Sequence, residues 1–156
     1  YLPDNNFLNS WMTVEQIVDF FADFYDDFRK ELAYEMLNRL AIEPSRKLKN
    51  LSKGNKEKVS LILVMSRNAK LYVLDEPIAG VDPATRGSIL NFIMENYGKD
   101  SSLLISTHLI NDLENIFTHA LFIGNGKALI NSNVQELTKD GKSIEDIFKE
   151  VFSNES

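Results

Sequence analysis

The sequence lacks several features, and each absence excludes a class of protein. It contains no cysteine, which excludes a disulfide framework and a thiolate metal site and makes a reducing compartment such as the cytosol the default expectation. Its longest apolar runs, Leu61 to Met65 and Leu71 to Leu74, are far shorter than the ~18 residues of a membrane span. An excess of positive charge is also missing, because the formal net charge is −6. Nucleic acid is therefore not an expected partner.

What is present suits a single α/β domain. The chain has 156 residues, of which 44% are hydrophobic and 26% charged, enough for one core of about 100–150 residues. The first fifty or so residues predict helices, starting with a capping box at Thr13 and Gln16. From Ser52 onward, helices alternate with apolar strands, which is typical of a largely parallel sheet, and Asn125-Gly126 predicts an antiparallel hairpin at its edge.

The elements expected after Ser52 can be stated by residue range. We expect a helix over about 53–67, buried strands at 71–75 and 103–105, a helix capped by Asp82-Pro83, a short helix from His108, and a last helix capped by Ser143.

Aromatic residues recur at helical spacing along the first predicted helix. We interpret this stripe as primarily core, with a partner site that also involves Phe7 and Trp11 as the alternative. Its members are Phe20, Phe21, Phe24, Tyr25 and Phe28.

The most informative segment is 71–77, where an apolar strand stops at Asp75, Glu76 and Pro77. Ligands of open α/β sheets bind outside the carboxyl ends of the strands. Carboxylates at that position can hold Mg²⁺ and polarise water for phosphoryl transfer. The alternative is that the two acids only end a core strand and solvate a loop.

Three further polar loops accompany this strand. Ser52 precedes a predicted helix, so that its hydroxyl and the free amides of the first turn can face an anion, although a serine there is more often only a helix cap. Segment 79–82 follows the acids, and segment 106–108 ends the next apolar strand.

In this order the loops resemble the ATP-binding subunits of ABC transporters, over nearly the whole chain. The resemblance implies a P-loop NTPase-like α/β fold, with a mostly parallel sheet, flanking helices and an N-terminal helical subdomain at about 5–50. Residues 1–156 would then be the C-terminal part of a single, incomplete ABC ATPase domain. The matching motifs are the signature (Leu51 to Asn55), the Walker B strand (Leu71 to Asp75), the catalytic glutamate (Glu76), the D-loop (Ala79 to Asp82) and the switch histidine (His108).

The resemblance also implies a role for each residue. Asp75 would hold Mg²⁺ through water, Glu76 would orient or deprotonate the attacking water, and His108 would sense the γ-phosphate of ATP. The signature loop would contact ATP held by a second subunit, and Asp82 would communicate across that interface. The signature residues concerned are Ser52, Lys53, Gly54 and Asn55.

The chain departs from the family pattern at three positions. Lys53 replaces a glycine and Asn55 a glutamine, which makes the signature loop bulkier and more basic. Lys53 either helps to hold phosphate or lies on the surface as a solvated lysine. Asp4 falls where the family usually has the glutamine of the Q-loop, and an ionised aspartate cannot donate a hydrogen bond.

These features suggest the energising subunit of an ABC-2-type exporter of drugs, peptides or polysaccharides. The resemblance implies ATP and Mg²⁺ as cofactors. Its implied partners are a second ATP-binding subunit, in a head-to-tail dimer, and an integral membrane permease, at the inner face of the cell membrane. The alternatives are a soluble ABC ATPase without a transport role, and a truncated cassette acting as a non-enzymatic dimerisation or regulatory module.

The sequence contains no glycine-rich phosphate-binding loop with Lys-Ser/Thr. Without that loop the β- and γ-phosphates lose their backbone cradle and their lysine. We therefore expect the 156-residue chain alone to bind ATP weakly or not at all and to be inactive.

Overall fold

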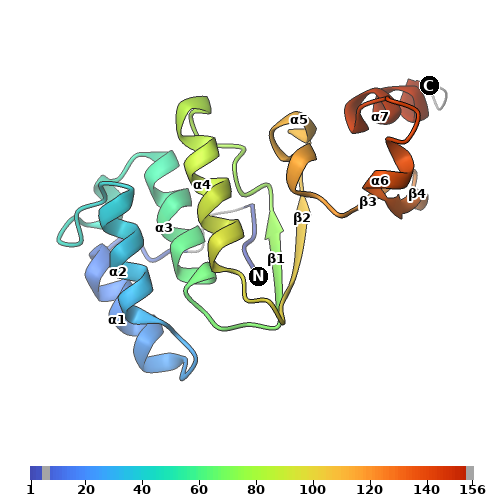
Figure 1. The fold of residues 1–156 in the computed structure, drawn as a ribbon. Coiled ribbons are helices and arrows are strands. Elements are labelled where there is room, and N and C mark those ends of the chain that lie inside the picture. The colour runs from blue at the N-terminus through green and yellow to red at the C-terminus, as the bar shows by residue number, and fades with distance from the viewer. Residues whose placement is uncertain (5–7, 154–156) are drawn as a thin grey trace. The chain divides into compact units, whose positions relative to one another are not determined.

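A computed structural model describes residues 1–4 and 8–153, so Phe7 lies outside the described residues. The chain divides into two compact units, Tyr1–Thr107 and His108–Ser156. Figure 1 shows the helices and strands of each. Among the described residues, no helix is both long and apolar enough to cross a bilayer.

The N-terminal unit alternates helices and strands after a helical start. The strand predicted at 71–75 is confirmed at both ends, and the helix predicted over 53–67 ends two residues earlier, at Met65. In chain order the elements are α1 (Val14–Phe24), α2 (Lys30–Arg39), the 3₁₀ turn η1 (Leu48–Asn50), α3 (Lys53–Met65), β1 (Leu71–Asp75), α4 (Pro83–Asn96) and β2 (Ser102–Ser106).

Side-chain caps explain where these helices begin. The predicted capping box is confirmed: Thr13 Oγ1 accepts the Gln16 N–H at 3.2 Å, and the Gln16 side chain accepts the Thr13 N–H at 2.9 Å. Asp82 caps α4, whose first residue is Pro83, and Ser52 caps α3. Each cap satisfies an amide that the helix itself leaves unpaired.

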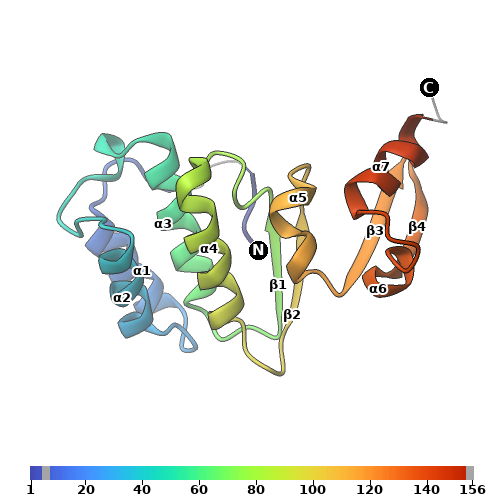
Figure 2. The ribbon, with the colours of Figure 1, turned by 45° about the horizontal axis from the view of Figure 1, so that its top comes forward.

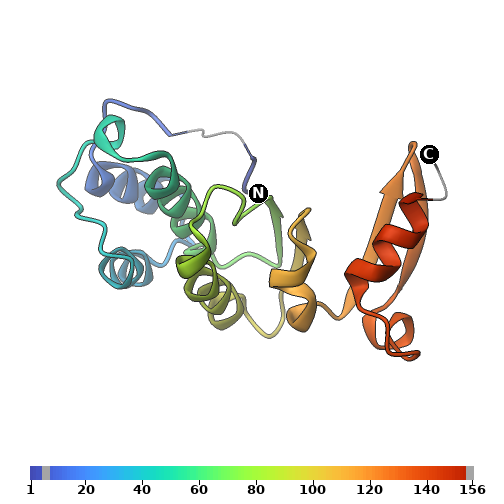
Figure 3. The ribbon, with the colours of Figure 1, turned by 90° about the horizontal axis from the view of Figure 1, so that it is seen from above.

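Helix α3 is the centre of this unit. Every residue from Val59 to Met65 is buried, which is typical of a helix enclosed on all sides. It contacts both α1 and α2, and α4 lies beside it in all the ribbon views (Figures 1 to 3). The signature motif precedes this buried stretch: Ser52 and Lys53 are exposed, and the chain continues from them directly into the core.

Arg29 ties the ends of two helices together. Its Nη2 donates to the carbonyls of Met65, Arg67 and Asn96 at 2.7, 3.0 and 3.2 Å. Met65 ends α3 and Asn96 ends α4, so one guanidinium serves carbonyls that have no partner within their own helices. A cation at two helix C-termini is also favoured by the helix dipoles.

Strands β1 and β2 are parallel, with Asp75 opposite Ser106. Leu2 bridges to the other edge of β1 at Leu74: its N–H donates to Val73 O at 2.8 Å, and its carbonyl accepts the Asp75 N–H at 2.9 Å. The spatial order is therefore Leu2, β1, β2. This pairing brings the first four residues beside the end of β1.

The expectation that the strand at 103–105 is buried is wrong. No residue of β2 is buried, and Leu104 is 55% exposed. An apolar run predicts that a strand prefers burial, but whether it is covered depends on elements packed over it. The parallel strand pair itself is confirmed.

The interpretation of the aromatic stripe as primarily core is also wrong. Phe20 and Phe24 are 52% and 67% exposed, with their rings stacked 6.0 Å apart, and Phe21, Tyr25 and Phe28 are only half-buried. Val14, Ile17 and Val18 fill the buried face of α1 instead.

The C-terminal unit is a hairpin packed against helices. Asn125 and Gly126 both have positive φ, 49° and 74°, as a type I′ turn requires. The predicted hairpin is confirmed, but β3 and β4 pair as a sheet of their own rather than as an edge of the parallel sheet. The elements are α5 (Ile110–Leu113), η2 (Glu114–Ile116), β3 (His119–Gly124), β4 (Lys127–Asn133), α6 (Val134–Leu137) and α7 (Ile144–Ser153).

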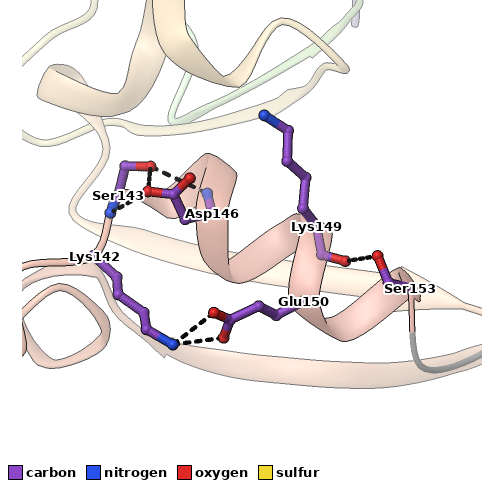
Figure 4. A network of polar contacts seen from close by, with 6 residues as sticks. All are labelled: Lys142, Ser143, Asp146, Lys149, Glu150 and Ser153. Atoms are coloured by element: carbon purple, nitrogen blue, oxygen red, sulfur yellow. Dashed lines mark hydrogen bonds and ion pairs between the residues drawn. The ribbon is translucent and has the colours of Figure 1, made fainter.

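Polar contacts fix both ends of α7 (Figure 4). The predicted cap is confirmed, because Ser143 Oγ accepts the Asp146 N–H at 3.1 Å and donates to Asp146 Oδ2 at 2.8 Å. Lys142 Nζ contacts both oxygens of Glu150 at 2.6 and 2.7 Å. At the other end, the Ser153 hydroxyl donates to the Lys149 carbonyl at 2.6 Å.

Candidate active site

The two acids at the end of β1 each meet a hydroxyl from the end of β2. Ser106 Oγ donates to Asp75 Oδ1, and Thr107 Oγ1 donates to Glu76 Oε2 at 3.4 Å. These contacts follow from the register, which places Asp75 opposite Ser106. The sequence shows only that Ser-Thr follows an apolar strand, and the register with β1 decides which acids the two hydroxyls meet.

Glu76 has an unusual backbone conformation. Its φ is 48°, in the left-handed region that costs a non-glycine residue about 1–3 kcal/mol. Its N–H donates to the Ser106 carbonyl at 3.0 Å, so the pairing with β2 holds the residue in place. Strain of this kind is typical of functional sites. No sequence pattern at this position predicts it.

Asp4 joins these acids in a pocket of about 250 Å³. The Leu2 bridge to β1 delivers it there, on the side of β1 away from β2. The polar lining consists of Asp4, Lys53, Glu57, Ser60, Asp75 and Glu76. The structure thus brings together three segments that the sequence analysis related only through a family resemblance. Glu57 was not predicted for this site.

The start of α3 has the geometry of a capped helix. Ser52 Oγ accepts the Asn55 N–H at 3.3 Å, which leaves its own O–H free to donate. Gly54 is close to the loop after β1: a Cβ atom on it would lie 3.2 Å from Gly80 O. The Lys53 side chain is 89% exposed, and its Nζ atom is 3.8 Å from Glu57 Oε1, a long distance for an ion pair. Lys53 is therefore a solvated lysine with a weak partner.

Positive charge is concentrated around this helix start. Segment 46–58 carries six cations and one acid, a net charge of 6 − 1 = +5 in a chain of net charge −6. The negative net charge of the whole chain hides this local excess of positive charge, which the sequence nevertheless contains and which the sequence analysis did not identify. The cations are Arg46, Lys47, Lys49, Lys53, Lys56 and Lys58.

Asp82 is engaged in its own helix cap. Its Oδ1 accepts the Thr85 N–H at 3.1 Å and its Oδ2 accepts the Thr85 hydroxyl at 2.7 Å. The hydrogen bond from the Thr85 hydroxyl lowers the pKa of Asp82 below its ordinary value. The carboxylate therefore has a structural role within one protomer, and its predicted role at an interface stays a prediction.

His108 directly follows Thr107 in the chain and is the first residue of the C-terminal unit. Its predicted contact with the γ-phosphate stays a prediction.

The acids fit a metal in one particular way. Within residues 1–4 and 8–153 there is no group of three or more His, Cys, Asp or Glu side chains that could hold a metal ion. Mg²⁺ keeps several waters and binds through one or two carboxylates together with substrate phosphates. The lining of the pocket would thus suit an ion held mainly by water and phosphate, and the assignment of Asp75 as its protein ligand stays a prediction.

Solved structures define the class to which this fold belongs. An ATP-binding subunit of an ABC transporter has a TM-score of 0.84 at 23% identity, over 97% of this chain and 67% of that one. A nucleotide-free ATP-binding cassette from an ABC transporter has a TM-score of 0.64 at 26% identity, over 84% of this chain and 59% of that one. The fold is that of an ATP-binding cassette of the P-loop NTPase class.

The family model described as ABC transporter matches residues 1–79, and the chain belongs to this family. It is 30% identical to the ABC transporter ATP-binding protein YtrB of Bacillus subtilis, over 95% of this chain and 51% of that protein. It is 28% identical to an uncharacterised ABC transporter ATP-binding protein of Methanocaldococcus jannaschii, over 93% of this chain and 57% of that protein. The chain spans about half the length of these curated relatives.

Proposed function

We propose that this chain supplies the hydrolytic acids and the signature helix of an ATPase that energises an ABC-type exporter. The observation that carries the proposal is the single pocket that gathers Asp4, Asp75 and Glu76 beside the start of α3. Carboxylates in this position can hold Mg²⁺ and orient water, which is most of what phosphoryl transfer requires of a protein.

The signature helix would act on a second nucleotide. Its free first-turn amides, the Ser52 hydroxyl and the basic segment 46–58 all favour an anion. In this proposal the anion is the γ-phosphate of ATP bound by a second cassette, in a head-to-tail dimer docked on a membrane permease at the inner face of the membrane. Drugs, peptides or polysaccharides are the proposed cargo.

Substitution of the catalytic acid tests the proposal in the whole protein. Glu76→Gln preserves the shape of the side chain and removes the base, so we expect ATP turnover to fall by about 10²–10⁴-fold while ATP binding is retained. Phosphate release and nucleotide binding measure the two effects, with Glu35→Gln, outside the pocket, as the matched control. Normal steady-state hydrolysis by Glu76→Gln would remove Glu76 from its role.

The 156-residue chain itself gives a second test. Because its sequence has no glycine-rich loop to cradle the phosphates, we expect titration with Mg-ATP to show weak binding or none. Micromolar affinity for Mg-ATP would contradict this expectation.

A further inference from the structure

Glu57 lies on α3, one turn after Lys53, and its carboxylate packs against the loop that follows β1. A Cβ atom placed on Gly80 would lie 1.8 Å from Glu57 Oε2 and 2.3 Å from Oε1. The carboxylate therefore occupies the space that any side chain at position 80 would need. Oε2 is shielded from solvent and has no hydrogen-bond partner among the described residues.

The loop against which Glu57 packs is held by its buried Ile78 and Val81 side chains and by few backbone hydrogen bonds of its own. The Ala79 N–H donates to Glu76 O and the Val81 N–H donates to Ile78 O, both at 3.2 Å, which is at the long end for such bonds. Packing from outside must therefore contribute to its conformation. Glu76 stands at one end of this loop and Asp82, the cap of α4, at the other.

Charge pairing contributes little at this contact. Lys53 Nζ is 3.8 Å from Glu57 Oε1, with the lysine 89% exposed, and such surface pairs stabilise weakly. The Glu57 side chain, in contrast, is only 24% exposed. The carboxylate is thus packed on Gly80, with only a weak ion pair on its other side.

We propose that Glu57 is a positioning residue: it holds the loop 76–82 against the start of α3, so that the hydrolytic acid and the signature helix keep a fixed relation. Gly54 adds a second point of contact, because a Cβ atom on it would lie 3.2 Å from Gly80 O. A side chain at position 80 would therefore have to displace this carboxylate, whereas the φ of Gly80 lies outside the left-handed region and adds no further demand for glycine. The role in ATP hydrolysis rests on the proposed function, whereas the coupling of helix and loop does not.

A double-mutant cycle in the 156-residue chain tests this coupling. Hydrogen exchange of the Ala79 and Val81 amides, followed by NMR, reports opening of the loop. Glu57→Ala should accelerate this exchange about three- to tenfold through local opening. Gly80→Ala should do the same by displacing the carboxylate. In the Glu57→Ala background, Gly80→Ala should have no further effect, because the space is then empty.

Two variants separate packing from charge and from general destabilisation. Glu57→Gln keeps the shape of the side chain and should restore slow exchange, while Lys53→Ala should leave exchange unchanged. Urea midpoints of all variants, measured in parallel, exclude global unfolding as the cause. Additive effects of the two alanine substitutions, or unchanged exchange in Glu57→Ala, would overturn the proposal. So would acceleration by Lys53→Ala equal to that by Glu57→Ala, because the ion pair would then be the essential contact.

The catalytic consequence is measured in the whole protein. If Glu57 positions Glu76, Glu57→Ala should lower kcat for ATP by about tenfold or more with KM little changed, and Glu57→Gln should restore it. Unchanged kcat in Glu57→Ala would refute the catalytic part. Absence of hydrolysis in the unsubstituted protein would instead refute the proposed function and leave the exchange measurements as a valid test of the coupling.

Discussion

Arg29 gives the most demanding prediction about stability. Its Nη2 atom donates to three carbonyls, at the ends of α3 and α4 and just beyond α3. One such nitrogen carries two hydrogens, so the three contacts amount to about two full hydrogen bonds. Hydrogen bonds from charged groups contribute about 1.5–3 kcal/mol each. With a discount for partial exposure, Arg29→Ala should lower the free energy of unfolding by about 2–4 kcal/mol.

Urea unfolding followed by circular dichroism measures this loss. With a urea dependence of about 2 kcal/mol per molar, in the middle of the usual range, the midpoint should fall by about 1–2 M. Arg39→Ala is the matched control, because among the described residues Arg39 makes a single side-chain contact, to Glu95 at 3.1 Å, with both side chains about half exposed. That control should cost under about 1 kcal/mol. Equal losses for the two variants would refute the claim that Arg29 joins the helix ends.

Two further predictions concern the N-terminal unit. The hydrogen bond from Arg67 Nε, at 2.6 Å, lowers the pKa of Asp27 below its ordinary value. The pair therefore stabilises the fold at neutral pH. This stabilisation is lost as the pH falls through the lowered pKa. Unfolding measured from pH 6 to 2 should show this loss in the native chain and not in Asp27→Asn; equal acid sensitivity of the two would contradict it. The uncovered strand β2, with Leu104 55% exposed, should promote self-association, so light scattering should show oligomers that Leu104→Lys reduces; a monodisperse monomer would count against this.

Local sequence patterns predicted the elements well and their surroundings poorly. The strand 71–75, the capping box at Thr13 and the Asn125-Gly126 turn all depend on short-range chemistry, and all are confirmed. The burial of β2 depends on segments packed over it, which no local pattern contains. For the same reason the exposed rings of Phe20 and Phe24 were not foreseen.

The candidate site shows the same division. The family resemblance assigned the two acids and the start of α3 to different nucleotides, and the pocket shows that these segments also lie beside each other within one chain. The hydroxyl contact of Thr107 depends on strand register, and the left-handed backbone of Glu76 depends on the bond to Ser106. Both arise only when two strands pair. Spacing along one chain therefore could not reveal them.

The bridge of Leu2 to β1 has a consequence for the charge of the pocket. Two backbone hydrogen bonds, of 2.8 and 2.9 Å, hold this residue, and an isolated bridge opens more readily than a strand in the core. Asp4 travels with it, so the pocket can gain or lose one negative charge without any movement of Asp75 or Glu76. Cation affinity at this site would then report directly on how firmly the first four residues are docked.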